Sequence, residues 1–169
     1  MTSDPFTYRF ESPADGPWIE TTQAQLFGPA RFKRAAYVLR DGVPHDPRLS
    51  FVAEADGQLV ASVRMTPILI GGREAVLLGP LIVAPAYRGR GAGRALVRKA
   101  LAAAHAAGHQ VVLLVGDLPY YGPLGFTFLG RDVIKLPAPV DPDRVLVAPL
   151  VAGALEGLGG EAQSVREGR

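Results

Sequence analysis

The stretch LLGPLIVAPAYRGRGAGRALV, residues 77–97, carries the strongest structural signal in the chain. It begins as an apolar run that ends at Pro85, which has no amide hydrogen for a strand ladder. Gly89, Gly91 and Gly93 follow directly before an Ala/Leu-rich segment of helical composition. Glycines let a ligand lie against the main chain, and a helix N-terminus offers unpaired amide hydrogens and a positive dipole. The stretch therefore predicts a strand, an anion-binding loop and a helix.

The form of the loop narrows the choice of anion. A Walker loop needs Gly-Lys-Ser/Thr, and residues 93–95 read Gly-Arg-Ala. A dinucleotide fingerprint fails in both registers, because an arginine or a leucine occupies its last position. The form that fits is Arg-x-x-Gly-x-Gly over residues 88–93, entering a helix. Arg88, Arg90 and Arg94 add charge beside the amides, so a pyrophosphate suits this loop better than a single carboxylate.

Patterns on either side of this stretch predict the remaining elements. Asp56-Gly57 and Gly71-Gly72 supply tight turns between successive antiparallel strands. A strand, a helix and a second apolar strand over residues 73–115 indicate a right-handed unit with parallel strands. Helices are expected over residues 17–27, 30–40 and 91–107, one or two helical turns over 119–124, and strands over 6–10, 49–54, 58–70, 73–83, 111–115, 126–128 and 144–150.

Composition places the chain among folded globular proteins. It has 169 residues, of which 48% are hydrophobic and 20% are charged, so we expect one α+β domain over residues 1–169. The segment of about 158–169 is rich in Gly and Glu and is expected to be flexible. The net charge is only +2 and the arginines are scattered, which does not indicate a nucleic-acid partner.

Several other classes are excluded by what the sequence lacks. There is no cysteine, which excludes disulfides, thiolate metal sites and a cysteine-bound acyl intermediate. His105 and His109 are separated by the helix-ending Gly108, and the chain has only three histidines, so no metal site is expected. The first residues show no apolar signal segment, and the longest uncharged run, residues 100–116, contains histidines and glutamine. We therefore expect a cytoplasmic protein with no membrane partner.

Residues 77–97 resemble the acyl-CoA-binding core of the GNAT superfamily of N-acyltransferases. The order of the expected elements also fits that fold, and Tyr121 with Gly125-Phe126 has the family's Tyr-x-x-x-Gly-Phe spacing. Residues 145–160, VLVAPLVAGALEGLGG, are similar to the ending of one largely uncharacterised subgroup. The resemblance covers residues 6–160. It implies an α+β fold whose mixed, mostly antiparallel sheet has about six or seven strands, flanking helices, and a splayed parallel pair at the cofactor site.

The resemblance implies acetyl-CoA as co-substrate and direct transfer of its acyl group to a primary amine of a small molecule or a protein. The pantetheine arm would bond the main chain of Leu81, Ile82 and Val83, in a gap opened by a bulge near Gly79-Pro80. An amide of Leu81 or Ile82 would stabilise the oxyanion, and Tyr121 would protonate the leaving thiolate. The loop residues implied to bind the pyrophosphate are Arg88, Gly89, Arg90, Gly91, Ala92, Gly93 and Arg94.

Some roles stay open at the level of sequence. The neighbouring Tyr120 could face the sulfur, although the spacing favours Tyr121, and Tyr121 could also be a core residue packed on Phe126. No acidic residue lies on residues 76–83, and Asp117 could simply cap a short helix. The candidate bases are Glu54, Glu74, Asp117 and His45. Because no base stands out, a non-catalytic acyl-CoA-binding or sensing module is the alternative function.

In this fold the acceptor would be selected by the first two helices and their loop, residues 15–47, and by the hairpin after Phe128. These segments are mixed in charge, with Glu20, Arg31, Lys33, Arg34, Arg40 and Asp41, and the second helix has a basic excess. This excess suits either an anionic acceptor or a solvated helix face, and the solvated face is the simpler interpretation. The apolar segment 145–150 could extend the sheet across a homodimer.

Overall fold

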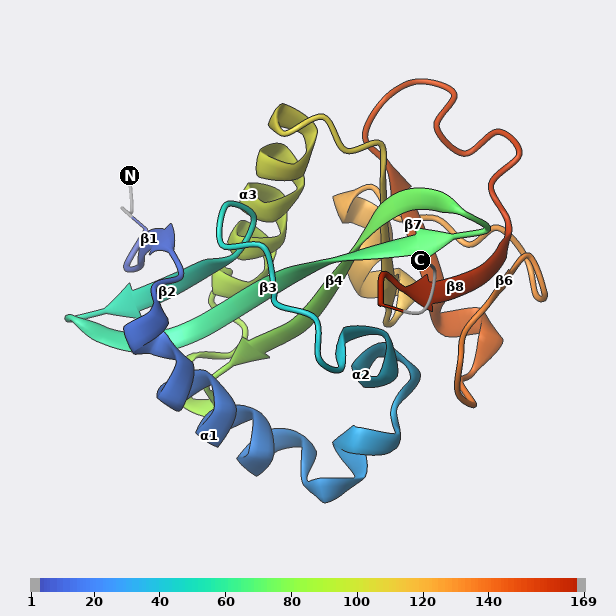
Figure 1. Cartoon of the computed structure of the whole chain (residues 1–169). Coiled ribbons are helices and arrows are strands. Elements are labelled where there is room, and N and C mark those ends of the chain that lie inside the picture. The colour runs from blue at the N-terminus through green and yellow to red at the C-terminus, as the bar shows by residue number, and fades with distance from the viewer. Residues whose placement is uncertain (1–3, 167–169) are drawn as a thin grey trace.

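The computed structural model describes residues 4–166, apart from the side chains of Phe32 and Lys33. The helices are α1 Gly16–Phe27, α2 Ala35–Arg40, α3 Ala92–Ala106 and α4 Leu118–Tyr121 (Figure 1). The strands are β1 Thr7–Phe10, β2 Phe51–Ala55, β3 Gln58–Ile70, β4 Arg73–Val83, β5 Val111–Val115, β6 Ile134–Lys135, β7 Val145–Pro149 and β8 Gly160–Ser164. Short 3₁₀ turns are η1 Pro13–Asp15, η2 Pro29–Lys33, η3 Pro85–Tyr87, η4 Gly122–Leu124 and η5 Pro142–Arg144.

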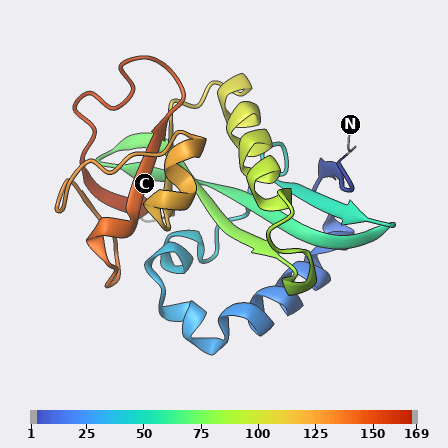
Figure 2. The same cartoon turned by 180° about the vertical axis from the view of Figure 1, so that it is seen from behind.

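The strands form one mixed sheet in the order β1-β2-β3-β4-β5-β7, with β8 paired to β3 and β6 paired to β8. The pairs β4–β5 and β6–β8 are parallel and the others are antiparallel. This confirms the predicted α+β fold with a mostly antiparallel sheet, which has eight strands within residues 4–166 where about six or seven were expected. Figures 1 and 2 show α3 on one face of the sheet, and α1 and α2 on the other.

Apolar stripes attach the helices to the two faces. The buried positions of α3 include Leu96, Val97, Ala100 and Ala104, which recur at helical spacing and pack on strands β2 to β5. On the opposite face Leu39 of α2 packs against β3, β4 and β5. These two layers fix the N-terminus of α3 and the C-terminus of α2 on opposite sides of β4.

A bulge bends β4 in the middle of the sheet. Val63 of β3 pairs with Leu81, and Met65 pairs with Leu78, so Gly79 and Pro80 of β4 stand opposite the single residue Arg64. The parallel pairing of β4 with β5 consists of Val76 with Val112 and Leu77 with Leu113, among the residues that the structure describes. Beyond Leu77 the two strands separate, which confirms the predicted splayed parallel pair next to a bulge.

The turns between strands adopt the backbone that their sequences predict. Asp56 and Gly57 have φ of 51° and 76°, and Gly71 and Gly72 have φ of 54° and 84°. Both central positions of such hairpin turns need positive φ, which Gly and Asp tolerate. The boundaries predicted for β3, β4 and β5 agree with the structure residue by residue.

Three local predictions are wrong. Residues 126–128 form no strand; Thr127 makes an isolated bridge to Val147, because the glycine turns on either side, Gly125 and Gly130 with φ of 107° and 120°, leave too short a segment. The helix expected over residues 30–40 is divided into η2 and α2, because Arg34 is extended, with ψ of 140°.

The third error concerns the C-terminal segment, expected to be flexible over about residues 158–169. Residues 160–164 form β8, and residues 167–169 lie outside the described part of the chain. β8 pairs with Ile68, Leu69 and Ile70 of β3, beyond the reach of the shorter β2. Main-chain groups at a buried strand end need partners, and β8 supplies them.

The edge strand β7 has its outer side partly occupied. Thr127 exchanges two hydrogen bonds with Val147, with N–O distances of 2.8 and 3.0 Å. A second copy of the chain would meet this bridge if it added a strand at β7. Sheet extension across a homodimer therefore stays a prediction.

Candidate active site

Three cavities adjoin one another where β4 and β5 separate. We call them the loop cavity, of about 520 Å³, the central cavity, of about 550 Å³, and the outer cavity, of about 190 Å³. The loop and central cavities share Phe27, Leu81, Arg88 and Tyr120. The central and outer cavities share Gln23, Tyr37, Arg40 and Pro80. A ligand entering at the glycine loop can thus reach the bulge of β4.

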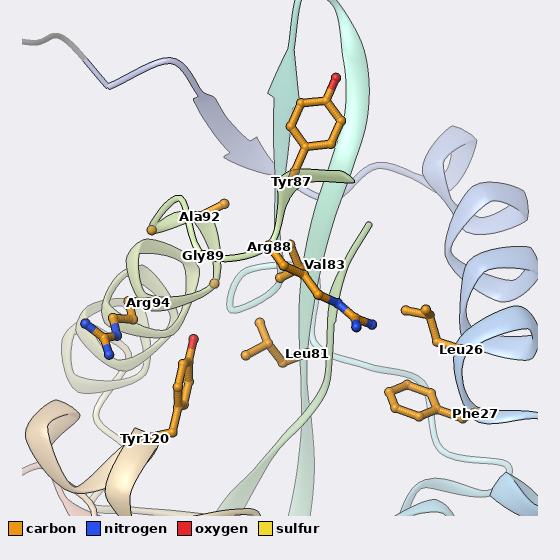
Figure 3. Close-up of a pocket in the computed structure, with 12 residues that line it drawn as sticks. Leu26, Phe27, Leu81, Val83, Tyr87, Arg88, Gly89, Ala92, Arg94 and Tyr120 are labelled. Carbon is orange, nitrogen blue, oxygen red and sulfur yellow. The ribbon is translucent and has the colours of Figure 1, made fainter. Parts of the chain in front are cut away.

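The loop cavity lies at the N-terminus of α3 (Figure 3). Gly91 is the N-cap of α3, with φ of 92°, and Gly89 has φ of 76°; a Cβ atom on either would meet no atom within 4 Å. Main-chain amides at this helix end have no helical acceptor, so they are available to an anion. Six of the seven predicted loop residues line the cavity: Arg88, Gly89, Gly91, Ala92, Gly93 and Arg94.

Arginines and tyrosines surround the loop. The seventh predicted residue, Arg90, lies over the ring of Tyr87, with its Cζ atom 5.6 Å from the ring centroid. Arg94 lies over the ring of Tyr120 at 5.5 Å. In Figure 3 the side chain of Arg88 extends away from α3, toward α1. The cavity therefore has positive charge on both of its sides.

One edge of β4 is open toward the loop cavity. The amide of Ala84 donates to the carbonyl of Val60 at 2.8 Å. Because main-chain groups alternate in direction along a strand, Ile82 must likewise pair with β3, while Leu81 and Val83 direct their N–H and C=O groups to the open side. The side chain of Ile82 is fully buried against Ile19. Of the three predicted β4 contacts, two have main-chain groups available to a ligand.

Tyr120 and Tyr121 occupy different positions. Tyr120 lines both the loop and the central cavity, and a Cβ on Gly93 would come within 2.8 Å of its hydroxyl oxygen. Tyr121 lines the central cavity beside the bulge of β4. Its ring packs edge to face on Tyr120 and Phe126, with centroids 4.7 and 5.8 Å apart. Tyr121 is thus both a packed residue and a cavity wall.

Burial changes the acidity of Tyr121. Desolvation of its phenol, assisted by the negative charge of Asp117, raises the pKa of Tyr121 to about 12. The phenol therefore keeps its proton throughout the neutral range. A group in this state can donate a proton to an anion that forms in the cavity.

The four candidate bases are not equivalent. Glu54 is paired with Arg9, whose Nη2 lies 2.8 Å from its Oε1, and Glu74 is exposed at the start of β4; neither lines the three cavities. Asp117 lines the central cavity and His45 lines the outer cavity. The proposed capping role of the Asp117 side chain is wrong, because that carboxylate makes no cap bond and instead accepts from Nε of Arg144 at 3.2 Å.

A buried carboxylate organises the wall behind the outer cavity. The carboxylate of Glu11 accepts two hydrogen bonds from Arg64, at 2.9 and 3.0 Å, and lies 3.1 Å from Nε2 of His45. Arg64 also reaches Glu20 at 3.0 Å. Burial raises the pKa of Glu11, but the hydrogen bonds from His45 and Arg64 outweigh that effect and hold the pKa below its ordinary value. This network connects β3, α1 and the loop before β2.

A family model described as the acetyltransferase (GNAT) family matches residues 13–126. The chain belongs to this family. The matched region includes the whole glycine loop and ends at Phe126, the last residue of the Tyr-x-x-x-Gly-Phe spacing. The predicted family and the predicted class of enzyme, an acyl-CoA-dependent N-acetyltransferase, are confirmed.

Relatives of this GNAT chain occur in bacteria. The uncharacterised N-acetyltransferase YhbS of Escherichia coli K12 is 30% identical over 156 residues, which cover 90% of this chain and 92% of YhbS. The uncharacterised N-acetyltransferase YjhQ of the same organism is 28% identical over 130 residues, covering 75% of this chain and 72% of YjhQ.

Two solved GNAT structures hold the predicted co-substrate or its product. The structure of Escherichia coli YhbS in complex with CoA matches with a TM-score of 0.81 and 27% identity, over 97% of this chain and 92% of that chain. The structure of a GNAT acetyltransferase from Brucella melitensis in complex with acetyl-CoA matches with a TM-score of 0.56 and 28% identity, over 90% and 99% of the two chains.

Some cavity residues of this GNAT chain carry no recognisable signal in its sequence. Leu26 and Tyr87 line the loop cavity, and Gln23, Tyr37 and Arg144 line the central cavity. Each is an ordinary residue of its own segment, and only the fold brings it to the site. Within residues 4–166 no group of three or more His, Cys, Asp or Glu side chains is placed to hold a metal ion. In the same range no helix has the length and apolar character needed to cross a membrane.

Proposed function

We propose that this GNAT chain transfers an acetyl group from acetyl-CoA to a primary amine by direct attack of the amine on the thioester. The observation that carries the proposal is the separation of β4 from β5 beyond Leu77, which joins the loop cavity to the bulge at Gly79-Pro80. This channel runs from the N-terminus of α3, whose amides would bind an anion, to the partly buried phenol of Tyr121. Such a channel fits an extended cofactor with a pyrophosphate at one end and a reactive thioester at the other.

The loop would bind the pyrophosphate of the cofactor. A helix dipole contributes only about 0.3–1 kcal/mol at an exposed site, so several amides must act together with the arginines. The absence of Cβ atoms at Gly89 and Gly91 leaves room for phosphate oxygens against the main chain. Arg88 and Arg94, which line the same cavity, would supply the charge. The open main chain of Leu81 and Val83 would then bond the pantetheine arm.

The transfer itself needs three groups: a base for the amine, a hydrogen-bond donor for the oxyanion and an acid for the thiolate. A base must leave the amine neutral, and Asp117 and His45, directly or through water, are the candidates that line the cavities. The amide of Leu81 would donate to the oxyanion on the thioester carbonyl. As the new C–N bond forms and the C–S bond breaks, the phenol of Tyr121 would give its proton to the departing thiolate. The phenol is protonated at neutral pH and can therefore donate to the departing sulfur.

The first test is thermal unfolding with acetyl-CoA, CoA, NADH and ATP, each in large excess. A ligand at about one hundred times its dissociation constant adds roughly 2.7 kcal/mol of stability. We expect acetyl-CoA and CoA to raise the unfolding midpoint, and NADH and ATP to leave it unchanged. Absence of any shift with both CoA species would overturn the proposal.

The second test separates an enzyme from a non-catalytic acyl-CoA sensor. CoA release is followed with acetyl-CoA and a panel of primary amines, small molecules and peptides alike. An enzyme releases CoA in an amine-dependent way, whereas a sensor binds acetyl-CoA without turnover. A cytoplasmic location stays a prediction, which fractionation of cells expressing the chain would test.

A further inference from the structure

Arg40 is a cation of the central cavity that forms no ion pair within residues 4–166, although the charge of Glu20 acts on it favourably. It is the last residue of α2, it is partly buried, and it lines both the central and the outer cavity. Its Cζ atom lies 5.6 Å from the ring centroid of Tyr37. Among the residues that the structure describes, its guanidinium makes no hydrogen bond and no ion pair. A guanidinium has five donors in a planar fork, so a ligand can still engage them.

Two carboxylates at or behind the outer cavity, Glu11 and Glu20, are already engaged, whereas Asp41, which also lines that cavity, is exposed. Glu11 and Glu20 are both bonded to Arg64, and Glu11 also lies against His45. Burial, followed by the charge of Arg64, lowers the pKa of Arg40 to about 10. Arg40 is therefore still charged at neutral pH, in a place where water stabilises that charge poorly.

The other charged residues that line the central cavity are also mostly positive. The cavity is lined by five arginines and one carboxylate: Arg31, Arg34, Arg40, Arg88, Arg144 and Asp117. That carboxylate, Asp117, accepts from Arg144 at 3.2 Å. The cavity thus has a positive excess, on the side of β4 that α1 and α2 cover. An excess of one sign in a concave site favours ligands of the opposite sign.

The cofactor does not account for Arg40. The loop cavity, where a pyrophosphate would bind, is not lined by Arg40 and has its own arginines, Arg88 and Arg94. Arg40 instead lines the same two cavities as Pro80 of the bulge, where the thioester would meet its acceptor. The charge is consequently on the acceptor side of the reacting carbonyl.

We propose that the acceptor is a small amine that carries a compact anionic group, a carboxylate or a phosphate, and that the guanidinium of Arg40 holds that group. This inference rests on the proposed acetyl transfer, because it names the acceptor class of the same site. A cavity of about 550 Å³ admits a small molecule beside the thioester. Holding the anion at Arg40 would direct the amine of the same molecule toward the bulge of β4.

The test uses matched amines that differ in charge. The panel contains the common amino acids and their carboxamides, and phosphoethanolamine with ethanolamine. Calorimetric binding to the CoA-loaded protein and kcat/KM with acetyl-CoA are measured for each pair. We expect at least one anionic member to exceed its neutral partner tenfold or more in both measurements. A preference for amino acids over their carboxamides identifies a carboxylate as the preferred group, and a preference for phosphoethanolamine over ethanolamine identifies a phosphate.

Variants link the preference to Arg40. Arg40→Gln is expected to remove the tenfold preference, chiefly through KM, and Arg40→Lys to keep part of it. The control is Arg48→Gln, at an exposed arginine paired with Asp46 outside the three cavities. An unchanged thermal shift with CoA shows that each variant is folded and keeps its cofactor cavity.

The outcomes separate this inference from the proposed function. If neutral amines bind and react as well as anionic ones, or if the preference survives in Arg40→Gln, the acceptor class is wrong while acetyl transfer stands. If anionic amines bind in an Arg40-dependent way without being acetylated, the anion site at Arg40 stands, while acetyl transfer and with it the role of these amines as acceptors are overturned. If no anionic amine binds the CoA-loaded protein, the acceptor class is overturned.

Discussion

The loop cavity and the central cavity lie side by side, yet the chain builds them differently. Most walls of the loop cavity come from one continuous stretch, residues 81–94, with additions from α1 and Tyr120. The central cavity takes its walls from α1, the turn after it, α2, the bulge of β4, the end of β5, α4 and Arg144. One cavity is encoded locally, and the other exists only in the folded chain.

The difference extends to the groups that each cavity offers. The loop cavity presents main-chain amides and glycine backbone, which any sequence with the right turn would supply. The central and outer cavities present side chains whose positions depend on long-range pairs such as Glu11 with Arg64. We therefore expect changes at the loop to affect cofactor affinity rather than acceptor use, and changes behind the outer cavity to affect stability and acceptor use.

The largest expected effect is at Tyr121, the proposed acid, which lines the central cavity. Tyr121→Phe removes only the phenol oxygen, and we expect kcat to fall by about 10²–10⁴-fold, the usual contribution of a positioned acid. Stabilisation by CoA should be retained, because the ring packing on Tyr120 and Phe126 stays. Steady-state kinetics and thermal unfolding measure the two quantities.

Tyr120→Phe is the matched control for that change. It removes the same atom from the tyrosine that lines both cavities. A greater loss of kcat in Tyr120→Phe than in Tyr121→Phe would identify Tyr120, in place of Tyr121, as the acid.

The second effect is on stability, at the buried ion pair behind the outer cavity. Breaking a buried pair by removing one charge costs on the order of 3 kcal/mol, so Glu11→Gln should lower the unfolding midpoint by roughly 6–12 °C. The matched control is Asp143→Asn, which breaks the exposed pair with Arg131 and should cost no more than about 1 kcal/mol. Equal losses in both variants would contradict the assigned role of Glu11.

The same carboxylate makes stability depend on pH. Because the pKa of Glu11 is lower in the folded state than its ordinary value of 4.5, its pair stabilises the fold above that pH. The stabilisation is lost as the pH falls below 4.5 toward the folded-state value. Chemical denaturation between pH 3 and 7 should show a shallower acid-side decline in Glu11→Gln than in the parent chain. Parallel declines would show that other carboxylates are responsible.

A smaller effect is expected at the loop. Gly91 has φ of 92°, and a side chain at such a position costs about 1–2 kcal/mol. Gly91→Ala should therefore weaken CoA binding about tenfold, measured by calorimetry, since the strained loop can no longer keep its amides in place. Gly108→Ala, with φ of 90° at the other end of α3, imposes a comparable strain away from the cavity and should leave affinity unchanged. Equal affinity losses would point to α3 as a whole.

The smallest expected effect is at Asp117. Its pair with Arg144 is exposed on both sides, so Asp117→Asn should change stability by less than about 1 kcal/mol. A fall of tenfold or more in kcat, with a pH profile that loses its acid-side limb, would identify Asp117 as the base in place of His45. A change of under threefold would favour His45.

Sequence reasoning succeeded wherever neighbouring residues decide the structure. The hairpin turns at Asp56-Gly57 and Gly71-Gly72, the stop at Pro85 and the glycine loop follow from backbone freedom at single positions. The bounds of β3, β4 and β5 were predicted from local patterns as well, and the bulge at Gly79-Pro80 from the family resemblance together with the missing amide hydrogen of Pro80. The residues of these segments allow few alternative backbone conformations.

Sequence reasoning failed where the structure of a segment depends on a partner that is distant in the chain. Nothing within residues 160–164 indicates that they complete the far end of β3. Nor does the segment around Ile82 reveal that this residue bonds β3 while its neighbours face the cavity. Pairing partners and strand register are properties of the assembled sheet.

By itself the sequence determined the loop cavity, because a glycine loop before a helix presents consecutive main-chain amides that suit an anion. Only the tertiary structure decided the central and outer cavities, where the acceptor is proposed to bind. The packing of α2 on the sheet brings Arg40 to the two cavities that Pro80 also lines, and the ion pairs of Arg64 engage Glu11 and Glu20. Whether Arg40 forms an ion pair depends on all the side chains around it, and these come from segments that meet only when the chain has folded.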